Sequence, residues 1–380
     1  MFNLLQGLRV IDLTSVVLGP YATQFLGDFG ADVIKVEPLA GDLFRYVRPG
    51  RSQKMGAGYL NLNRNKRSVA LDLKTESGKK VMAEILADAD VLVHNMRPAA
   101  LKRLGLDYET LSKDHPRLVY CVAAGFGKDG RNAEKPAYDD VIQAASGLAY
   151  LNTNEQGEPR FLPTIVCDKV GGLHLAMAVL AGTAYQARTG KGCFIEAPMF
   201  ESMVSFLMVE QMAGRSFTPP LGGIGYDRLL SPYRRPFKTK DGFIALLPYN
   251  SQHWANFLEF IGRDDIAHAD WVQDSAKRSE NINTLYEIVS QVMPQRTSND
   301  WLSHLHRLDI PCTLVNKLEE LFDDDHLRDV DFFPETDHPT EGKLNMVRSP
   351  FRVHGVEELP DKHAPELGEN NDNPTWENSR

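Results

Sequence analysis

The sequence predicts an α/β fold with a parallel sheet, accompanied by a smaller α+β domain. Short apolar segments alternate with helical patterns over roughly the first 212 residues, an order typical of parallel sheets. After that point the pattern changes to a Gly- and Pro-containing stretch, a hairpin signal and several short helices. A chain of 380 residues is long enough for two domains. We expect a large domain over 1–212, a linker and glycine-containing loop over 213–225, and a small domain over 226–330.

The elements of the first region follow from their apolar patterns. Thr75 is placed to cap a helix whose apolar residues share one face. Buried strands are expected where short β-branched runs are bounded by turns. The predicted strands cover 8–14, 31–37, 69–72, 90–94, 118–123 and 193–197, and the predicted helices cover 21–29, 76–87, 98–104, 138–149, 168–190 and 199–212.

The second region begins its regular structure at a hairpin. Asp241-Gly242 between two strand-like runs is a strong turn signal. Helical patterns follow at 254–261, 282–292 and 301–308, and short strand-like pieces return over 331–356, including 350–353. The tail from residue 370 is polar, so we expect it to be poorly ordered.

Composition and motifs limit the possible functions. A formal net charge of −9 argues against a nucleic-acid or membrane-surface binder. The four cysteines form no CxxC pair and no histidine cluster has metal-ligand spacing, so no metal site is indicated. The turn after the first strand lacks G-x-G-x-x-G, which leaves NAD chemistry unsupported. No secretory leader is recognisable at the first residues and no apolar run could span a bilayer, so we expect a cytoplasmic protein.

Asp168 is the first candidate for chemistry. It stands at the expected start of a helix that is apolar on every face over 173–180 except for His174, a pattern typical of a helix buried all round. Gly171 and Gly172 follow, so no side chain need block a ligand there. Asp168 is either an N-cap or a nucleophile that the helix N-terminus keeps ionised, and the spacing leaves both interpretations open.

Basic residues gather in the first hundred positions of this acidic chain. Such side chains are commonly solvated, but together they could bind phosphates, through bidentate Arg contacts and the point charge of Lys. The cluster consists of Arg64, Lys66, Arg67, Lys74, Arg97, Lys102 and Arg103.

Three further residues have a chemical and a structural interpretation. Tyr138, near a predicted helix start, could donate to a developing oxyanion or could be a packed aromatic. Cys167 is a rival nucleophile without an evident activating base. His174 lies almost opposite Asp168 on a helix, which makes an Asp–His pair improbable and favours a hydrogen-bonded interior histidine.

The chain resembles the class III CoA-transferase family, which includes formyl-CoA transferase, carnitine CoA-transferase and α-methylacyl-CoA racemase. Two matching elements are highly specific: Gly-Ala-Asp-Val-Ile-Lys-Val-Glu at 30–37 and Asn-Lys-Arg-Ser at 65–68. Further matches are Leu-Arg-Val-Ile-Asp-Leu-Thr at 8–14, Asp-Val-Leu-Val-His-Asn at 90–95, Tyr138, Asp168, the apolar run 174–182 and Leu-Gly-Glu at 367–369. The resemblance is strong over 1–215 and weak beyond.

This resemblance implies a large Rossmann-like domain, to which 331–380 returns, a small domain, and an interlocked homodimer. It implies acyl-CoA as substrate without a tightly bound cofactor, and Asp168 as the catalytic aspartate aided by Tyr138. The residues it places at CoA are Val16, Val17, Lys66, Arg67, Leu71, Lys74, Asn95, Met96, Arg97 and Arg103.

The implied reaction moves CoA from a thioester, with succinyl-CoA a candidate donor, to a carboxylic acid through anhydride and aspartyl-CoA intermediates on Asp168. Backbone N–H groups near 16–18 and 222–225 are candidate oxyanion donors. Arg45 and Arg48 could bind the second carboxylate of a dicarboxylic acid, or could be surface charges or ion-pair partners. The alternatives are an acyl-CoA racemase, although racemases of the family carry histidine where Tyr138 stands, and a non-catalytic acyl-CoA binder.

Overall fold

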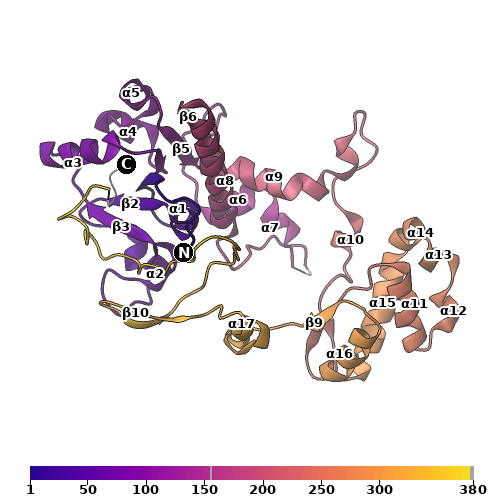
Figure 1. The fold of residues 1–380 in the computed structure, drawn as a ribbon. Helices are drawn as coiled ribbons and strands as arrows, with labels where there is room; N and C mark the ends of the chain where they lie inside the picture. The colour runs from indigo at the N-terminus through magenta and orange to yellow at the C-terminus, as the bar shows by residue number, and fades with distance from the viewer. Residues whose placement is uncertain (155, 377–380) are drawn as a thin grey trace. The chain divides into compact units, whose positions relative to one another are not determined.

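The structure is a computed structural model that describes residues 1–154 and 156–376. The chain divides into two compact units, Met1–Leu207 with Val330–Arg380, and Met208–Asp329. The first unit is therefore discontinuous in sequence, and the C-terminal segment, yellow in Figure 1, returns to the elements of the N-terminal half. Among the described residues, no helix combines the length and the apolar character needed to cross a membrane.

The first unit is built on a six-stranded parallel sheet in the order β3-β2-β1-β4-β5-β6. Its strands are β1 (Arg9–Leu13), β2 (Asp32–Glu37), β3 (Lys66–Ala70), β4 (Val91–His94), β5 (Val119–Ala124) and β6 (Cys193–Pro198). Its helices are α1 (Leu18–Asp28), α2 (Ala57–Leu62), α3 (Glu76–Ala87), α4 (Pro98–Leu104), α5 (Tyr108–Asp114), α6 (Asp139–Ala145), α7 (Leu148–Leu151), α8 (Val166–Thr189) and α9 (Met199–Gln211), the last continuing into the second unit.

Helices cover both faces of this sheet, which is why β1 to β4 are buried almost throughout, including their charged residues. Val10 and neighbouring valines on one face pack against α1 and α8. On the other face, Ile11 stands in register with Ile34 and Leu92, and all three pack against residues of α3, α4 and α5. The predicted parallel α/β fold is confirmed by this arrangement.

The second unit has its own core around a three-stranded antiparallel sheet, β7 (Phe237–Lys238), β8 (Phe243–Leu246) and β9 (Cys312–Leu314). The hairpin predicted at Asp241-Gly242 is confirmed by the antiparallel pairing of β7 with β8. Trp254 and Trp301 are buried in this core. Its helices are α10 (Asp227–Leu230), α11 (Ser251–Phe260), α12 (Asp264–Ala267), α13 (Asp270–Gln273), α14 (Ser275–Glu280), α15 (Ile282–Val292), α16 (Ser298–Arg307) and α17 (Asp325–Asp329).

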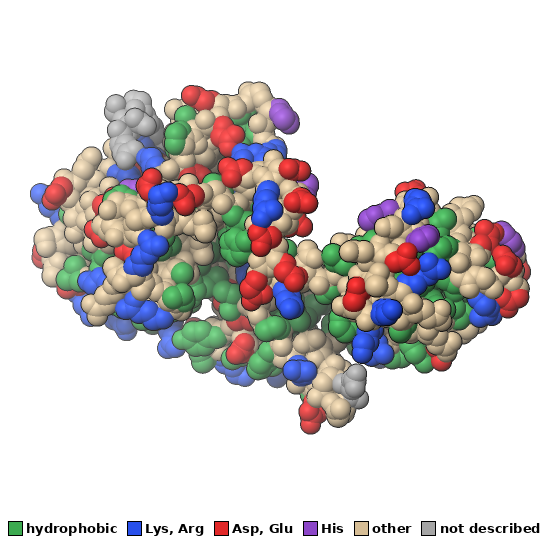
Figure 2. Space-filling model, turned by 90° about the horizontal axis from the view of Figure 1, so that it is seen from below, with side chains coloured by type: hydrophobic (Ala, Val, Ile, Leu, Met, Phe, Trp, Pro, Cys, Tyr) green, Lys and Arg blue, Asp and Glu red, His purple; other side chains and the backbone are tan. Residues whose placement is uncertain are grey.

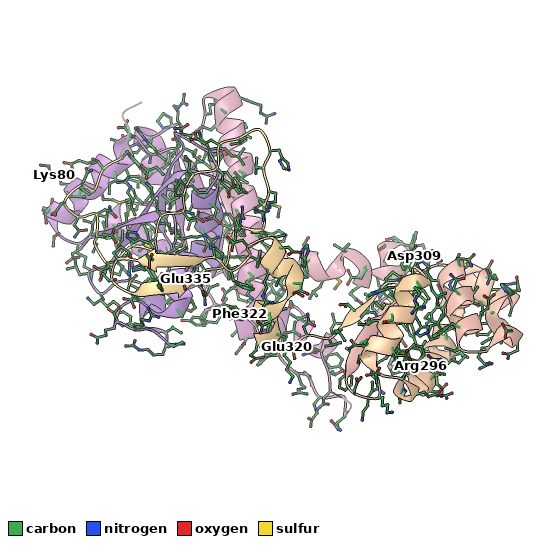
Figure 3. The ribbon with its side chains drawn as sticks, turned by 60° about the horizontal axis from the view of Figure 1, so that its bottom comes forward. Lys80, Arg296, Asp309, Glu320, Phe322 and Glu335 are labelled. Carbon is green, nitrogen blue, oxygen red and sulfur yellow. The ribbon has the colours of Figure 1, made fainter. Side chains whose placement is uncertain are left out.

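The returning C-terminal segment differs from expectation in two places. It contains the hairpin β10 (Glu335–His338) and β11 (Gly342–Asn345), with Glu335 labelled in Figure 3, but no strand at 350–353. The expectation of a poorly ordered tail is wrong for 370–376. The Asn370 N–H donates to Ser68 on β3 and the Trp376 indole N–H donates to the Ile85 carbonyl, so the polar tail covers the edge strand. Residues 377–380 lie outside the described residues.

Candidate functional site

A pocket of about 630 Å³ opens at the carboxyl ends of β1, β2, β3 and β4. Four of the residues expected at CoA line it: Leu71 and Lys74, which follow β3, and Asn95 and Met96, which follow β4. In the strand order, β2 and β3 lie on one side of β1, and β4, β5 and β6 lie on the other. The pocket opens at this change of direction, the position at which open α/β sheets bind ligands. The pocket is lined mainly by apolar side chains, and the Lys74 side chain at its margin is exposed.

The turn from β1 into α1 forms one side of this pocket and includes Val16 and Val17. Ser15, which lines the pocket, is fixed to β4 by Asn95, whose side chain accepts the Ser15 N–H at 3.1 Å and donates to the Ser15 carbonyl at 2.9 Å. Val17 precedes α1 and no side chain caps this helix, so its first N–H groups have no intrahelical partner.

Two expected phosphate ligands flank the pocket on α4. Arg97 immediately precedes this helix and is exposed, like Arg103 in its last turn. Leu104, the residue after Arg103, lines the pocket. Both guanidinium groups belong to the element that borders the pocket and can reach solvent.

The structure does not bring Lys66 and Arg67 to this pocket. Both lie at the amino end of β3, whereas the pocket is at the carboxyl end. Lys66 is buried and forms an ion pair with Asp12 at 3.1 Å, and Arg67 forms one with Asp32 at 2.9 Å. Both residues pair with carboxylates inside the protein. The sequence alone could not distinguish such pairing from phosphate binding.

Asp168 occupies the third position of α8, and its helix is capped by another residue. Asp139, the first residue of α6, accepts the backbone N–H groups of Cys167 at 2.7 Å and of Asp168 at 3.0 Å. Gln143, one turn further along α6, donates to the second oxygen of Asp139 at 2.7 Å and fixes it there. The N-cap interpretation of Asp168 is therefore wrong, and the hydrogen bonds described for this structure leave its carboxylate uncommitted.

The surroundings of Asp168 make its carboxylate unusually basic. Burial, followed by the negative charge of Asp139, raises the pKa of Asp168 from 3.8 to about 6. Cys167 is fully buried, and burial raises the pKa of its thiol to about 12, so it is a poor nucleophile. The His174 Nδ1 lies 2.8 Å from the Val170 carbonyl oxygen, so the predicted hydrogen bond is present, although the side chain is only half-buried.

Asp168 lies on the side of α8 that packs against the start of α1. Gly171 and Gly172 lie three and four residues beyond Asp168, on the same side of α8. A Cβ atom on Gly172 would lie 2.8 Å from the Leu18 carbonyl oxygen, and one on Gly171 would lie 2.7 Å from the Leu18 side chain. These glycines therefore admit the first turn of α1, and the expectation that they admit a ligand is corrected.

Other expectations about α8 and its neighbours are modified. The helix is not buried all round, because Leu173 is 42% exposed and Met177 is 56% exposed. Tyr138 is 71% exposed, so it is not a packed aromatic, and it immediately precedes Asp139, whose side chain accepts the Asp168 N–H.

The two arginines considered as ligands for the second carboxylate of a dicarboxylic acid differ in their environments. Arg45 is fully buried and forms two hydrogen bonds with Glu37, at 2.6 and 2.8 Å. It is therefore an internal ion-pair partner and cannot meet a substrate. Arg48 is exposed, and its guanidinium group donates to the carbonyl oxygens of Gly50 and Ser52.

The structure also reduces the number of backbone N–H groups that could serve as oxyanion donors. The Val16 N–H already donates to Asp42 at 3.0 Å, which leaves Val17 and Leu18 as donors on this turn. Gly225 donates its N–H to Gln211, and the stretch 222–225 belongs to the second unit.

Sequence reasoning did not assign roles to Asp139 or Asp42. For Asp139, the sequence signal was its spacing of four residues from Gln143, since residues at this spacing share one helix face. Asp42 caps the short helical turn that follows it, by accepting the Phe44 N–H at 2.9 Å, but its contacts with Lys35 and Val16 come from distant segments that no spacing indicates.

Comparisons with known proteins agree with this architecture. The family model for CoA-transferase family III matches residues 5–371. The human succinyl-CoA:glutarate CoA-transferase is 31% identical over 373 residues, covering 96% of this chain and 84% of the human protein. The succinyl-CoA:mesaconate CoA-transferase of Haloarcula hispanica is 31% identical over 377 residues, covering 96% and 94%.

Solved structures give the same result. The orthorhombic form of Rv3272 from M. tuberculosis has a TM-score of 0.84 and 28% identity, covering 97% of this chain and 98% of that one. A CAIB/BAIF family protein from Brucella suis has a TM-score of 0.81 and 27% identity, covering 98% of each chain. The family model matches nearly the whole chain, and the relatives are named as CoA-transferases. The chain therefore belongs to CoA-transferase family III.

Proposed function

We propose that the protein transfers CoA between carboxylic acids through covalent intermediates on Asp168. The observation that carries this proposal is the capping of α8 by Asp139, which leaves the Asp168 carboxylate uncommitted at the α1–α8 junction. The raised pKa of Asp168, about 6, supports the same role, because a more basic carboxylate is a stronger nucleophile that is still ionised at neutral pH.

The proposed sequence has four steps. The Asp168 carboxylate attacks the donor thioester carbonyl, forming a mixed anhydride and releasing CoA thiolate. The thiolate attacks the aspartyl carbonyl, forming an Asp168–CoA thioester and releasing the donor acid. The acceptor carboxylate attacks this thioester carbonyl, forming a second mixed anhydride with Asp168 and releasing CoA thiolate from the thioester. The thiolate then attacks the acceptor's acyl carbonyl, giving the new acyl-CoA and free Asp168.

Each tetrahedral intermediate needs hydrogen-bond donors placed in advance. The N–H groups of Val17 and Leu18, at the uncapped start of α1, are the proposed donors on this unit. Tyr138 is proposed to help close the site from the α6 side. The pocket bordered by Lys74, Arg97 and Arg103 is proposed to hold the adenosine and phosphates of CoA, with Leu71, Asn95 and Met96 lining it.

The proposed acceptor is a dicarboxylic acid. The relatives described above are named for succinyl-CoA, glutarate and mesaconate, and each of those acids has a second carboxyl group. Arg48 is the candidate for the distal carboxylate, since Arg45 is consumed by Glu37.

A cytoplasmic homodimer is proposed as the working form. The support for a second copy is the apolar surface that one chain exposes along α8 and α9, where Leu173, Met177, Phe206 and Val209 are 42%, 56%, 54% and 83% exposed. Hydrophobic side chains are also exposed among charged ones on the face of the protein in Figure 2. Large apolar side chains exposed in this way are typical of interaction sites.

The test is covalent trapping. The protein is incubated with succinyl-CoA, treated with hydroxylamine or borohydride, and digested for peptide mass analysis. We expect modification of the Asp168 peptide in the wild type and in Cys167→Ala, with loss of both label and turnover in Asp168→Ala. Label on Cys167 contradicts the proposal. Exchange of the α-proton with deuterium in the absence of an acceptor acid identifies a racemase, and CoA binding without turnover on a panel of acids identifies a non-catalytic binder.

A further inference from the structure

The turn between β1 and α1 contains a residue in an unfavourable backbone conformation. Val16 has φ +70°, a left-handed conformation that β-branched residues rarely adopt. Such a residue persists only where its surroundings hold it in place. The contact that holds it is the hydrogen bond from its N–H to the Asp42 carboxylate, at 3.0 Å to one oxygen and 3.3 Å to the other.

Asp42 is itself fixed by a buried cation. Lys35, from the middle of β2, places its Nζ 2.9 Å from Asp42, and the two side chains are 0% and 1% exposed. The same Nζ donates to the Thr14 carbonyl at 2.8 Å, two residues before Val16. Lys35 thus contacts the turn directly and also orients the carboxylate that holds it, away from competing water.

The opposite side of the turn is held by the Asn95 contacts with Ser15 described above. Thr14, Ser15 and Val16 are therefore each tied by a different side chain, from three separate segments. A surface loop of ordinary function does not need three such ties, whereas a turn whose next N–H groups must meet a substrate does.

We propose that Asp42, oriented by Lys35, is a positioning residue that keeps Val16 left-handed and so aims the turn at the acyl-CoA. This inference rests on the proposed CoA site for its binding readout. Asp42 does not touch the reacting atoms. Its effect is transmitted through the direction in which the chain leaves Val16 toward the first N–H groups of α1.

The experiment compares Asp42→Asn with Asp28→Asn. Asp28 forms an equally buried ion pair with Arg64, at the other end of α1 from the turn, so the control loses a similar internal charge pair without touching Val16. Asp42→Asn should raise the Kd for CoA and the KM for acyl-CoA about ten- to a hundred-fold with a smaller change in kcat. Amide hydrogen exchange of the CoA-free protein should show Val16 exchanging faster in Asp42→Asn and unchanged in Asp28→Asn.

A second background separates positioning from general stability. Glycine adopts positive φ freely, so in Val16→Gly the turn depends less on Asp42. Adding Asp42→Asn to Val16→Gly should therefore cost several-fold less in CoA affinity than adding it to the wild type. Equal losses in the two backgrounds, or wild-type affinity with a protected Val16 amide in Asp42→Asn, would overturn the inference. If the wild type binds no CoA, the proposed function is wrong. Faster exchange of the Val16 amide in Asp42→Asn would still support the inference that Asp42 holds Val16 in place.

Discussion

Replacing Asp168 by Asn should make the protein more stable while abolishing turnover. The raised pKa of Asp168 means that the folded state holds its ionised form at a cost. The rise from 3.8 to about 6 spans roughly two pH units, each worth about 1.4 kcal/mol, so the full penalty is about 3 kcal/mol. Asparagine keeps the shape of the side chain and removes the charge, so the penalty disappears.

The sign fixes the pH range. Because the folded pKa lies above the unfolded one, the penalty is absent below pH 3.8, grows between 3.8 and 6, and is fully present above 6. The stability gain of Asp168→Asn should therefore increase from about 1.5 kcal/mol at pH 5 to about 3 kcal/mol at pH 7.

The assay is urea unfolding of the two proteins between pH 5 and 8, with turnover measured in parallel. Turnover should fall by more than about 10⁴-fold, the scale seen when a covalent nucleophile is removed. Asp140→Asn is the matched control, because Asp140 is an exposed carboxylate beside Asp139 and its loss should change stability by less than about 0.5 kcal/mol. A destabilised Asp168→Asn, or a gain that does not vary with pH, would refute the reasoning.

Three other predictions follow from the same contacts. The rate of CoA transfer should fall as pH drops below about 6, and Asp139→Asn should move this acid limb to lower pH while burial keeps it above 3.8, as a pH–rate profile will show. Asp139→Ala, which loses both N–H contacts to α8, should destabilise the protein by about 1–2 kcal/mol in urea unfolding, whereas Asp139→Asn retains the cap and most of the stability. Lys74→Ala should weaken CoA binding by about tenfold in calorimetry, with a reduced dependence on salt; unchanged affinity would remove Lys74 from the site.

The sequence predicted those elements whose signals are local. Thr75 caps α3 as expected, by accepting the Gly78 N–H, and five of the six strands of the sheet lie within about a residue of their predicted ranges. The strand predicted at 69–72 is the exception, because β3 is Lys66–Ala70. The helix predicted at 21–29 begins three residues earlier than expected, at Leu18. Pro20 stands in the first helical turn, where its missing N–H costs nothing.

The site was less predictable than the fold because its contacts are not local. Asp168 resembles an N-cap in sequence, and only the approach of Asp139 from 29 positions earlier shows that the cap is supplied elsewhere. Lys66 and Arg45 look like anion ligands in sequence, but each has a carboxylate partner from another element. Tertiary packing decides which basic residues form buried ion pairs and which remain exposed to bind a ligand, and sequence spacing does not encode that packing.

The return of the C-terminal segment to the first unit also sets an order of events during synthesis. The Asn370 and Trp376 contacts with β3 and α3 cannot form until the ribosome has passed residue 376, whereas residues 208–329 are continuous and available earlier. At about 5–20 residues per second, the interval from 329 to 376 lasts several seconds. During this interval the edge of β3 in the nascent chain lacks its C-terminal contacts. The second unit can therefore fold before the C-terminal segment has packed against the first.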